Sequence, residues 1–148
     1  MGDRKLNLAR ARNLIGEKCG ELKNISSIYE TAAWGNIDQP MFLNQSLEIT
    51  TPLKPIPLLQ QILEIEKQLG RTRHEKYGPR IIDIDILFYN DEIYNDSLLT
   101  VPHPALQYRR FALKPMNELA PNFVHPVLKK TIAQLLEECP DDLPVNKL

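Results

Sequence analysis

An α+β fold with a largely antiparallel sheet is the fold class that this sequence predicts, and two observations lead to it. Pairs of strand-like segments alternate with helix-like segments along the 148 residues, and successive strands with short connections pair as antiparallel hairpins. The hydrophobic fraction of 43% and the charged fraction of 25% are ordinary for a globular protein. We therefore expect residues 1–148 to form a single domain.

Two helices are predicted in the first half of the chain. Asp3 is a suitable N-cap, and apolar residues follow it at near-helical spacing to about residue 19. The second helix begins near Pro55, carries an apolar stripe and ends at Gly70.

Two strands are predicted between these helices. Residues 25–31 and 41–49 are rich in β-branched and alternating residues, a pattern typical of strands. Their connection, AAWGNIDQP, contains turn-forming residues and is long for a tight hairpin. Loops of this kind often carry function.

The second half of the chain predicts a hairpin followed by two helices. Residues 82–88 alternate as a strand does, Asn90 and Asp91 favour a turn, and a short strand around Ile93 would complete the hairpin. Periodic apolar residues then predict helices over 109–119 and 131–138.

Residues 70–88, GRTRHEKYGPRIIDIDILF, carry the strongest chemical signal. Side chains alternate along a strand, so Asp83 and Asp85 would lie on one face and the neighbouring isoleucines on the other. Magnesium prefers one or two carboxylates together with water and substrate phosphates. This pair therefore suits a magnesium–polyphosphate site.

The loop before these aspartates supplies positive charge. Arginine forks bind phosphate oxygens bidentately and keep their charge near neutral pH. Taken alone, a basic loop is usually solvated, and aspartates on a strand usually form its wet face. Their adjacency favours a site in which a cation lies between carboxylates and phosphate. The basic residues are Arg71, Arg73, His74, Lys76 and Arg80.

Composition limits the other classes of function. The formal net charge of −1 argues against a surface built for nucleic acid. Cys19 and Cys139 stand far apart, which predicts neither a zinc site nor a disulfide framework. No signal peptide or membrane span is expected, so we expect a cytoplasmic protein without membrane or nucleic-acid partners.

Several motifs together resemble the 6-hydroxymethyl-7,8-dihydropterin pyrophosphokinase family. They are GDR, SSIYET, DQPMFLN, GRTRHEKYGPRIIDIDIL, LTVPHP and YRRFALKPMNELAP, and they extend to about Pro126. The resemblance implies a ferredoxin-like α+β sandwich with helices on the faces of a mostly antiparallel sheet. It implies an enzyme of folate biosynthesis that transfers the β,γ-diphosphate of ATP to a pterin hydroxymethyl group and releases AMP.

The resemblance also implies roles at the ATP side of the site. Asp83 and Asp85 would bind two magnesium ions and, with Arg71 and Arg80, form the catalytic set. The residues implied for ATP binding are Arg71, Arg73, Lys76, Arg80, Thr100, His103 and Arg109. The sequence assigns no general base: Asp85 is one candidate, and lowering of the hydroxyl pKa by the metal is the alternative.

The pterin side of the site is implied by five further positions. Phe42 and Phe111 match the two stacking rings, and Asn44 matches an amide that both donates and accepts. Thr31 and Trp34 match positions whose backbone lines the pocket. Taken alone, either phenylalanine would more often belong to a core, so these roles depend on the motif order.

The chain departs from the family pattern in two places. The family opens with a hydrophobic strand ending in GSNLGDR, whereas this sequence begins MGDR, and Tyr77 stands where members often carry tryptophan. Without that strand, neighbouring strands would be unpaired, and we expect weak folding or low activity.

Other classes of function remain open at this stage. A catalytically impaired homologue would bind nucleotide without turnover, a metal-dependent phosphohydrolase would cleave ATP without pterin, and a nucleic-acid-binding module would use the basic loop for phosphate contacts. We expect a monomer that acts on small molecules.

Overall fold

The computed structural model describes residues 3–31, 42–70 and 82–148, and the chain divides into two compact units. The first unit comprises residues 1–23 and 49–86, and the second comprises residues 24–48 and 87–148. In the described part of the chain, the secondary structure mixes four α-helices with short strands, and every pairing with a defined register is antiparallel. The predicted mixture of helices and antiparallel strands is therefore confirmed.

The first unit contains the two predicted helices of the first half. Helix α1 (Arg4–Lys18) begins at Asp3, whose carboxylate accepts the backbone N–H groups of Lys5 and Leu6 at 3.0 and 3.1 Å. This contact confirms the predicted N-cap, which satisfies N–H groups that have no partner within the helix.

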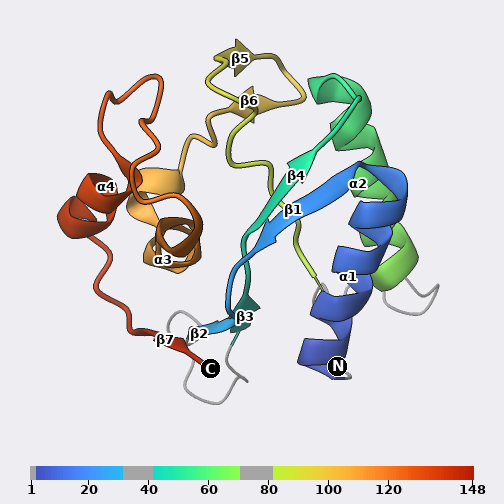
Figure 1. Ribbon diagram of the computed structural model, residues 1–148, viewed down its shortest axis with the longest axis horizontal. Helices are drawn as coiled ribbons and strands as arrows, with labels where there is room; N and C mark the ends of the chain where they lie inside the picture. Colours follow the sequence, from blue (N-terminus) through green and yellow to red (C-terminus); the bar gives the residue numbers. More distant parts are fainter. Residues whose placement is uncertain (1–2, 32–41, 71–81) are drawn as a thin grey trace. The chain divides into compact units, whose positions relative to one another are not determined.

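Helix α2 (Pro55–Gly70) packs against α1 (Figure 1). Its apolar stripe is confirmed, because Leu58, Ile62 and Ile65 are all buried and recur every three to four residues. Two residues after the end of α1, the chain passes close to the backbone of β4: a Cβ on Gly20 would lie 2.1 Å from the Thr50 carbonyl oxygen. Only glycine fits there without a backbone shift.

The two strands predicted over residues 25–31 and 41–49 are each broken into two. Strand β1 (Glu21–Ile25) pairs with β4 (Leu47–Thr50), and β2 (Tyr29–Thr31) pairs with β3 (Phe42–Asn44). The prediction of two continuous strands was therefore wrong.

Hydrogen bonds between the buried Ser26 and the facing residues 45 and 46 explain both breaks. The hydroxyl oxygen of Ser26 accepts the backbone N–H of Ser46 at 2.9 Å, and the side-chain amide of Gln45 donates to the Ser26 carbonyl at 2.7 Å. Side chains that bond to nearby backbone in this way compete with a regular ladder.

Strand β2 is the middle strand of a three-stranded antiparallel sheet in the second unit, with the order β3–β2–β7. Strand β7 (Val145–Lys147) was not predicted. It pairs Thr31 with Val145, while β3 pairs Thr31 with Phe42 and Tyr29 with Asn44. A strand of three residues is too short to give a periodic pattern.

Residues 82–88 do not form the predicted strand, and the predicted hairpin with Ile93 is absent among the described residues. Strand β5 (Tyr94–Asn95) instead pairs with β6 (Thr100–Val101). The expected turn at Asn90 is present, with a positive φ of 53°. A strand assignment requires a ladder partner. Among the described residues, this segment shares one backbone hydrogen bond with its neighbours, from the His103 N–H to the Leu87 carbonyl at 2.9 Å.

The core of the second unit lies between two helices and a short 3-10 turn. Helix α3 (Arg110–Leu119) follows the 3-10 turn Leu106–Tyr108 and packs beside α4 (Ile132–Glu138) (Figure 1). Helix α4 begins with a capping box between Thr131 and Gln134. Both helices confirm the predictions. The core is formed by Leu106 of the 3-10 turn, Leu113 of α3, and Ile132 and Leu135 of α4.

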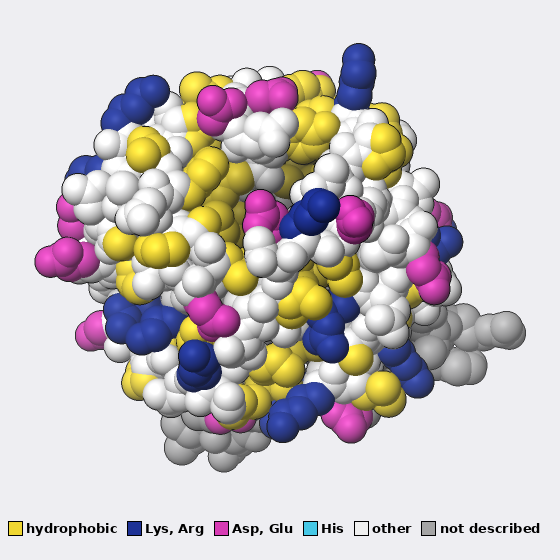
Figure 2. Space-filling view, in the orientation of Figure 1, with side chains coloured by type: hydrophobic (Ala, Val, Ile, Leu, Met, Phe, Trp, Pro, Cys, Tyr) yellow, Lys and Arg dark blue, Asp and Glu magenta, His cyan; other side chains and the backbone are white. Residues whose placement is uncertain are grey.

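Three further properties bear on the expected class of protein. Both cysteines are free: Cys19 is buried, and burial raises the pKa of its thiol, while Cys139 is half-buried. Acidic and basic side chains are interspersed on the face shown in Figure 2, which accords with the net charge of −1. Within residues 3–31, 42–70 and 82–148, no helix has the length and apolar character of a membrane span.

Candidate functional site

Asp83 and Asp85 lie in the first unit on the segment that follows α2. Both are exposed, whereas Ile82, Ile84 and Ile86 are half-buried. The predicted alternation of faces is therefore confirmed, although the segment forms no ladder with any of the described residues. The backbone N–H of Ile84 donates to the Glu66 carboxylate on α2 at 2.7 Å. This bond takes the place of a ladder bond. It attaches the segment to α2 at Ile84, the residue between the two aspartates.

The donor set of this segment fits magnesium. Two carboxylates that are two residues apart in an extended chain have α-carbons about 6.5 Å apart, and both aspartates are exposed on one side. Among the described residues, no group of three or more histidine, cysteine or acidic side chains is arranged to hold a metal. Within the described residues, this segment therefore offers two carboxylates, a set that leaves coordination positions for water and phosphate oxygens.

In the second unit, β2 and β3 bring two of the predicted pterin residues together. The side-chain amide of Asn44 donates to the Thr31 hydroxyl at 3.2 Å. Thr31 is buried, Asn44 is half-buried and Phe42, directly opposite Thr31, is 55% exposed. A large apolar ring at that exposure is available to a ligand, whereas a core ring is not.

The start of α3 carries two further predicted residues. Arg109 is the residue before the helix and Phe111 lies in the first turn. The guanidinium carbon of Arg109 lies 5.8 Å from the centre of the Phe111 ring, within the range of a cation–π contact. The structure therefore brings an expected phosphate-binding cation next to an expected stacking ring.

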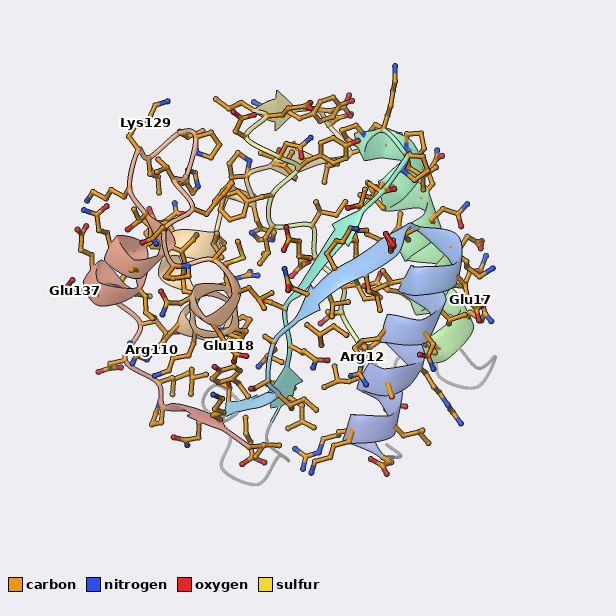
Figure 3. The ribbon with its side chains drawn as sticks, in the orientation of Figure 1. Arg12, Glu17, Arg110, Glu118, Lys129 and Glu137 are labelled. Atoms are coloured by element: carbon orange, nitrogen blue, oxygen red, sulfur yellow. The ribbon has the colours of Figure 1, made fainter. Side chains whose placement is uncertain are left out.

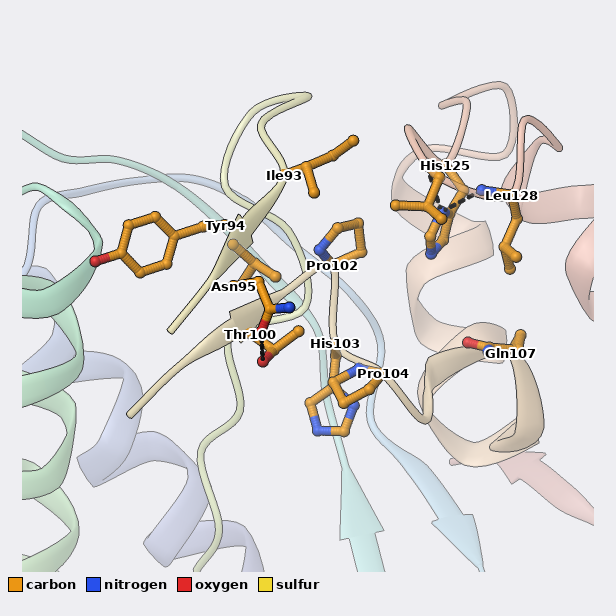
Figure 4. A pocket seen from close by; sticks show the side chains of 12 residues that line it. Ile93, Tyr94, Asn95, Thr100, Pro102, His103, Pro104, Gln107, His125 and Leu128 are labelled. Carbon is orange, nitrogen blue, oxygen red and sulfur yellow. Dashed lines mark hydrogen bonds between the residues drawn. The ribbon is translucent and has the colours of Figure 1, made fainter. Parts of the chain in front are cut away.

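Thr100 and His103 line the same cavity, which measures about 250 Å³ and lies wholly within the second unit. Figure 4 shows both side chains, with the Thr100 hydroxyl bonded to the Asn95 side-chain oxygen at 3.3 Å. The Nδ1 atom of His103 accepts the Ala105 N–H at 3.1 Å. In the neutral tautomer, its Nε2–H is consequently a donor.

The cavity wall is largely apolar, and two polar side chains in it were missed by the sequence analysis. Gln107 places a buried side-chain oxygen there that has no hydrogen-bond partner among the described residues. His125 is 4% exposed, and its Nδ1 accepts the N–H groups of Val127 and Leu128 at 3.1 and 3.0 Å (Figure 4). Neither residue belongs to a chemical motif, so the sequence held no signal for them.

We expect the stability of the second unit to fall as the pH drops from 7 to 5, because His125 is held neutral. Burial lowers the pKa of His125, so its stabilisation is complete above the usual histidine pKa of about 6.5 and is lost as the pH falls through the lower folded value. Protonation of Nδ1 also removes two backbone hydrogen bonds, on the order of 1–2 kcal/mol.

Chemical denaturation at both pH values measures this effect. His125→Asn keeps an acceptor without titrating, so it should lose less stability than the wild type between pH 7 and 5. Equal losses in the two proteins would contradict the prediction.

Several predicted site residues lie outside the described residues, and the structure therefore places none of them. They are Trp34, Arg71, Arg73, Lys76, Tyr77 and Arg80. The described ones divide between the two units, with Asp83 and Asp85 in the first and the other seven in the second. Those seven are Thr31, Phe42, Asn44, Thr100, His103, Arg109 and Phe111.

Comparison with known proteins gives consistent matches. The model of a family described as 7,8-dihydro-6-hydroxymethylpterin-pyrophosphokinase (HPPK) matches residues 1–121. A 2-amino-4-hydroxy-6-hydroxymethyldihydropteridine pyrophosphokinase of Aquifex aeolicus is 42% identical over 138 residues, which cover 93% of this chain and 86% of the relative. The protein of the same name in Synechocystis sp. is 44% identical over 80% of this chain and 60% of its own length.

A larger relative matches in only part of its length. The folic acid synthesis protein fol1 of Schizosaccharomyces pombe is 36% identical over 141 residues, which are 95% of this chain but 19% of that protein. The similarity therefore covers nearly all of this chain and a small share of that relative.

Proposed function

The chain belongs to the 7,8-dihydro-6-hydroxymethylpterin-pyrophosphokinase family and is a pyrophosphokinase, and from this premise we propose that it transfers the diphosphate of ATP to 6-hydroxymethyl-7,8-dihydropterin, releasing AMP. The observation that carries the proposal is the exposed pair Asp83 and Asp85, which directly follows the basic residues 71–80. Carboxylates beside phosphate-binding cations suit metal-assisted transfer from a nucleotide.

Asp83 and Asp85 are the residues that would hold magnesium, and we propose two ions. Magnesium bound there would neutralise and align the phosphate oxygens of ATP. The Ile84–Glu66 bond fixes the backbone between the two carboxylates, so both stay on the solvent side of the segment. Arg71, Arg73, Lys76 and Arg80 would add positive charge from the neighbouring loop.

The proposed reaction is a single displacement at the β-phosphorus. The hydroxymethyl oxygen of the pterin bonds to that phosphorus, the bond between it and the α,β-bridging oxygen breaks, and AMP leaves. The hydroxyl proton passes to Asp85 or to water. Such transfers need mainly alignment and charge neutralisation, which Arg71, Arg80 and the two aspartates would supply.

For the pterin, we propose recognition by the β2–β3 pair and α3. The Asn44 amide reads a donor–acceptor edge of the heterocycle, and its bond to Thr31 fixes the orientation of that amide. Phe42 and Phe111 stack on the ring faces, and the backbone at Thr31 and Trp34 completes the wall.

For ATP, we propose that Thr100 lies at the adenine and that His103 and Arg109 contact the phosphates. The bond from the His103 N–H to Leu87 holds this residue next to the end of the 82–88 segment. Its Nε2–H would donate to a phosphate oxygen, and Arg109 would bind another.

We further propose that the residues act as one ferredoxin-like domain, as a monomer and in the cytoplasm. The two free cysteines support a reducing compartment. The mixed secondary structure with antiparallel pairs supports the fold.

AMP formation tests the proposal directly. With ATP and magnesium, AMP should appear only when 6-hydroxymethyl-7,8-dihydropterin is added, and chelation of magnesium should stop it. Loss of ATP without pterin would instead indicate a phosphohydrolase. Nucleotide binding without AMP would indicate a catalytically impaired homologue, and either result would reject the proposal.

A further inference from the structure

Glu118 is an exposed acid whose carboxylate nevertheless accepts four hydrogen bonds from three donor groups. The backbone N–H of Ser27 donates to both oxygens at 3.2 and 3.0 Å, its hydroxyl donates at 3.3 Å, and the Tyr29 hydroxyl donates at 2.7 Å. Glu118 lies in the last turn of α3, where Figure 3 labels it, and the donors lie at or just before β2. The carboxylate therefore fastens the end of one helix to the start of one strand.

Strand β2 connects this contact to the proposed pterin residues. Tyr29 and Thr31 are two positions apart, so their side chains lie on the same face of the strand, and both are buried. Asn44 lies opposite Tyr29 and reaches diagonally to the Thr31 hydroxyl at 3.2 Å. The Glu118–Tyr29 contact and the Thr31–Asn44 pair therefore lie on one face of the same short sheet, two residues apart along β2.

Helix α3 connects the same contact to the stacking ring. Phe111 and Glu118 are seven positions apart, which places them on the same side of the helix and about 10 Å apart along its axis. Pro115 lies between them and has no N–H for the Phe111 carbonyl. Because α3 lacks that internal hydrogen bond, its position depends more on outside contacts such as the one that Glu118 makes near its end.

The two side chains of this contact keep fixed protonation states near neutral pH, with Glu118 ionised and Tyr29 neutral. The Tyr29 hydrogen bond is the main cause that lowers the pKa of Glu118, while burial and then the Glu118 contact raise the pKa of Tyr29 to about 12. At neutral pH, the contact is consequently between a carboxylate and a neutral phenol, a charge-assisted hydrogen bond.

We propose that Glu118 is a positioning residue for the pterin: it sets the spacing between Phe111 on α3 and the Thr31–Asn44 pair on β2 and β3. The inference rests on the proposed function, because it assigns those residues to the pterin.

Glu118→Gln and Tyr29→Phe test the positioning role. The glutamine keeps the size of the side chain but has one acceptor oxygen in place of two, and the phenylalanine removes one donor only. We expect the KM for pterin to rise about tenfold in Glu118→Gln and less in Tyr29→Phe. Because Arg109 stands at the start of the same helix, the KM for ATP should also rise, but by a smaller factor than the KM for pterin. The double variant should have the same KM for pterin as Glu118→Gln, because both substitutions act on the same contact between Tyr29 and Glu118.

Glu137→Gln is the matched control. Glu137 is exposed in the last turn of α4 (Figure 3), so the same change at a comparable position should leave both KM values as they are. A loss of stability alone would lower the amount of active enzyme without separating the two KM values.

Equilibrium binding of the pterin, with a non-hydrolysable ATP analogue present, separates the possible failures. Weaker pterin binding by Glu118→Gln supports the positioning role even if turnover is slow. If the wild type binds and converts the pterin, and Glu118→Gln has unchanged pterin affinity or an equal rise in both KM values, the positioning role alone is overturned. A wild type that does not bind the pterin overturns the proposed function and this inference with it.

Discussion

Alanine at position 83 is expected to lower the rate of AMP formation by on the order of a thousandfold. Asp83 is one of the two exposed carboxylates of the 82–88 segment, and its removal leaves the magnesium–ATP complex with one anchor. The turnover number at saturating ATP and pterin measures the effect. In a magnesium titration, the difference in rate between the wild type and Asp83→Ala should become smaller as the magnesium concentration rises.

Asp91→Ala provides a matched control for this loss. Asp91 is an exposed aspartate in the turn that follows the same segment, so removing it changes the net charge equally and leaves the proposed site intact. Its activity should stay within about twofold of the wild type. Asp83→Ala activity within threefold of the wild type would refute the metal-binding role.

Leu113→Ala is expected to lower the free energy of unfolding by about 2–5 kcal/mol. Leu113 is fully buried between α3 and α4 in contact with the core of the second unit, so the truncation leaves a cavity that rigid neighbours cannot fill. Urea denaturation followed by circular dichroism measures the loss.

Leu98→Ala is the control for the core substitution. Leu98 is 68% exposed, and the same truncation at that exposure should change the free energy of unfolding by less than about 0.5 kcal/mol. Equal losses for the two variants would show that the core described between α3 and α4 does not support the fold.

Helices were more predictable from the sequence than strands in this protein. The Asp3 cap and the apolar stripe of α2 follow from local spacing, and the structure confirms both. The continuous strands at 25–31 and 41–49 were wrong because Ser26 makes contacts with residues about 20 positions away. Pairing partners of this kind are not encoded in local pattern, and the hairpin of residues 82–88 failed for the same reason.

The candidate site was predictable in its residue types and only partly in its arrangement. Alternation placed Asp83 and Asp85 on one exposed side, as the structure confirms. The motif order assigned Asn44 and Thr31 to the same pocket but did not predict the hydrogen bond between their side chains. Gln107 and Glu118 were missed because their importance comes from partners and burial rather than from spacing. The roles of Arg71, Arg73, Lys76 and Arg80 stay predictions.

The unequal burial of the two cysteines makes the chain suitable for site-selective labelling. Cys139 in the second unit is half-buried, whereas Cys19 in the first is 2% exposed with its thiol pKa raised by burial. A thiol-reactive fluorophore therefore reaches Cys139 first, and Cys19 reacts only when the first unit opens. Pulsed labelling can thus follow the opening of one unit independently of the other without any substitution.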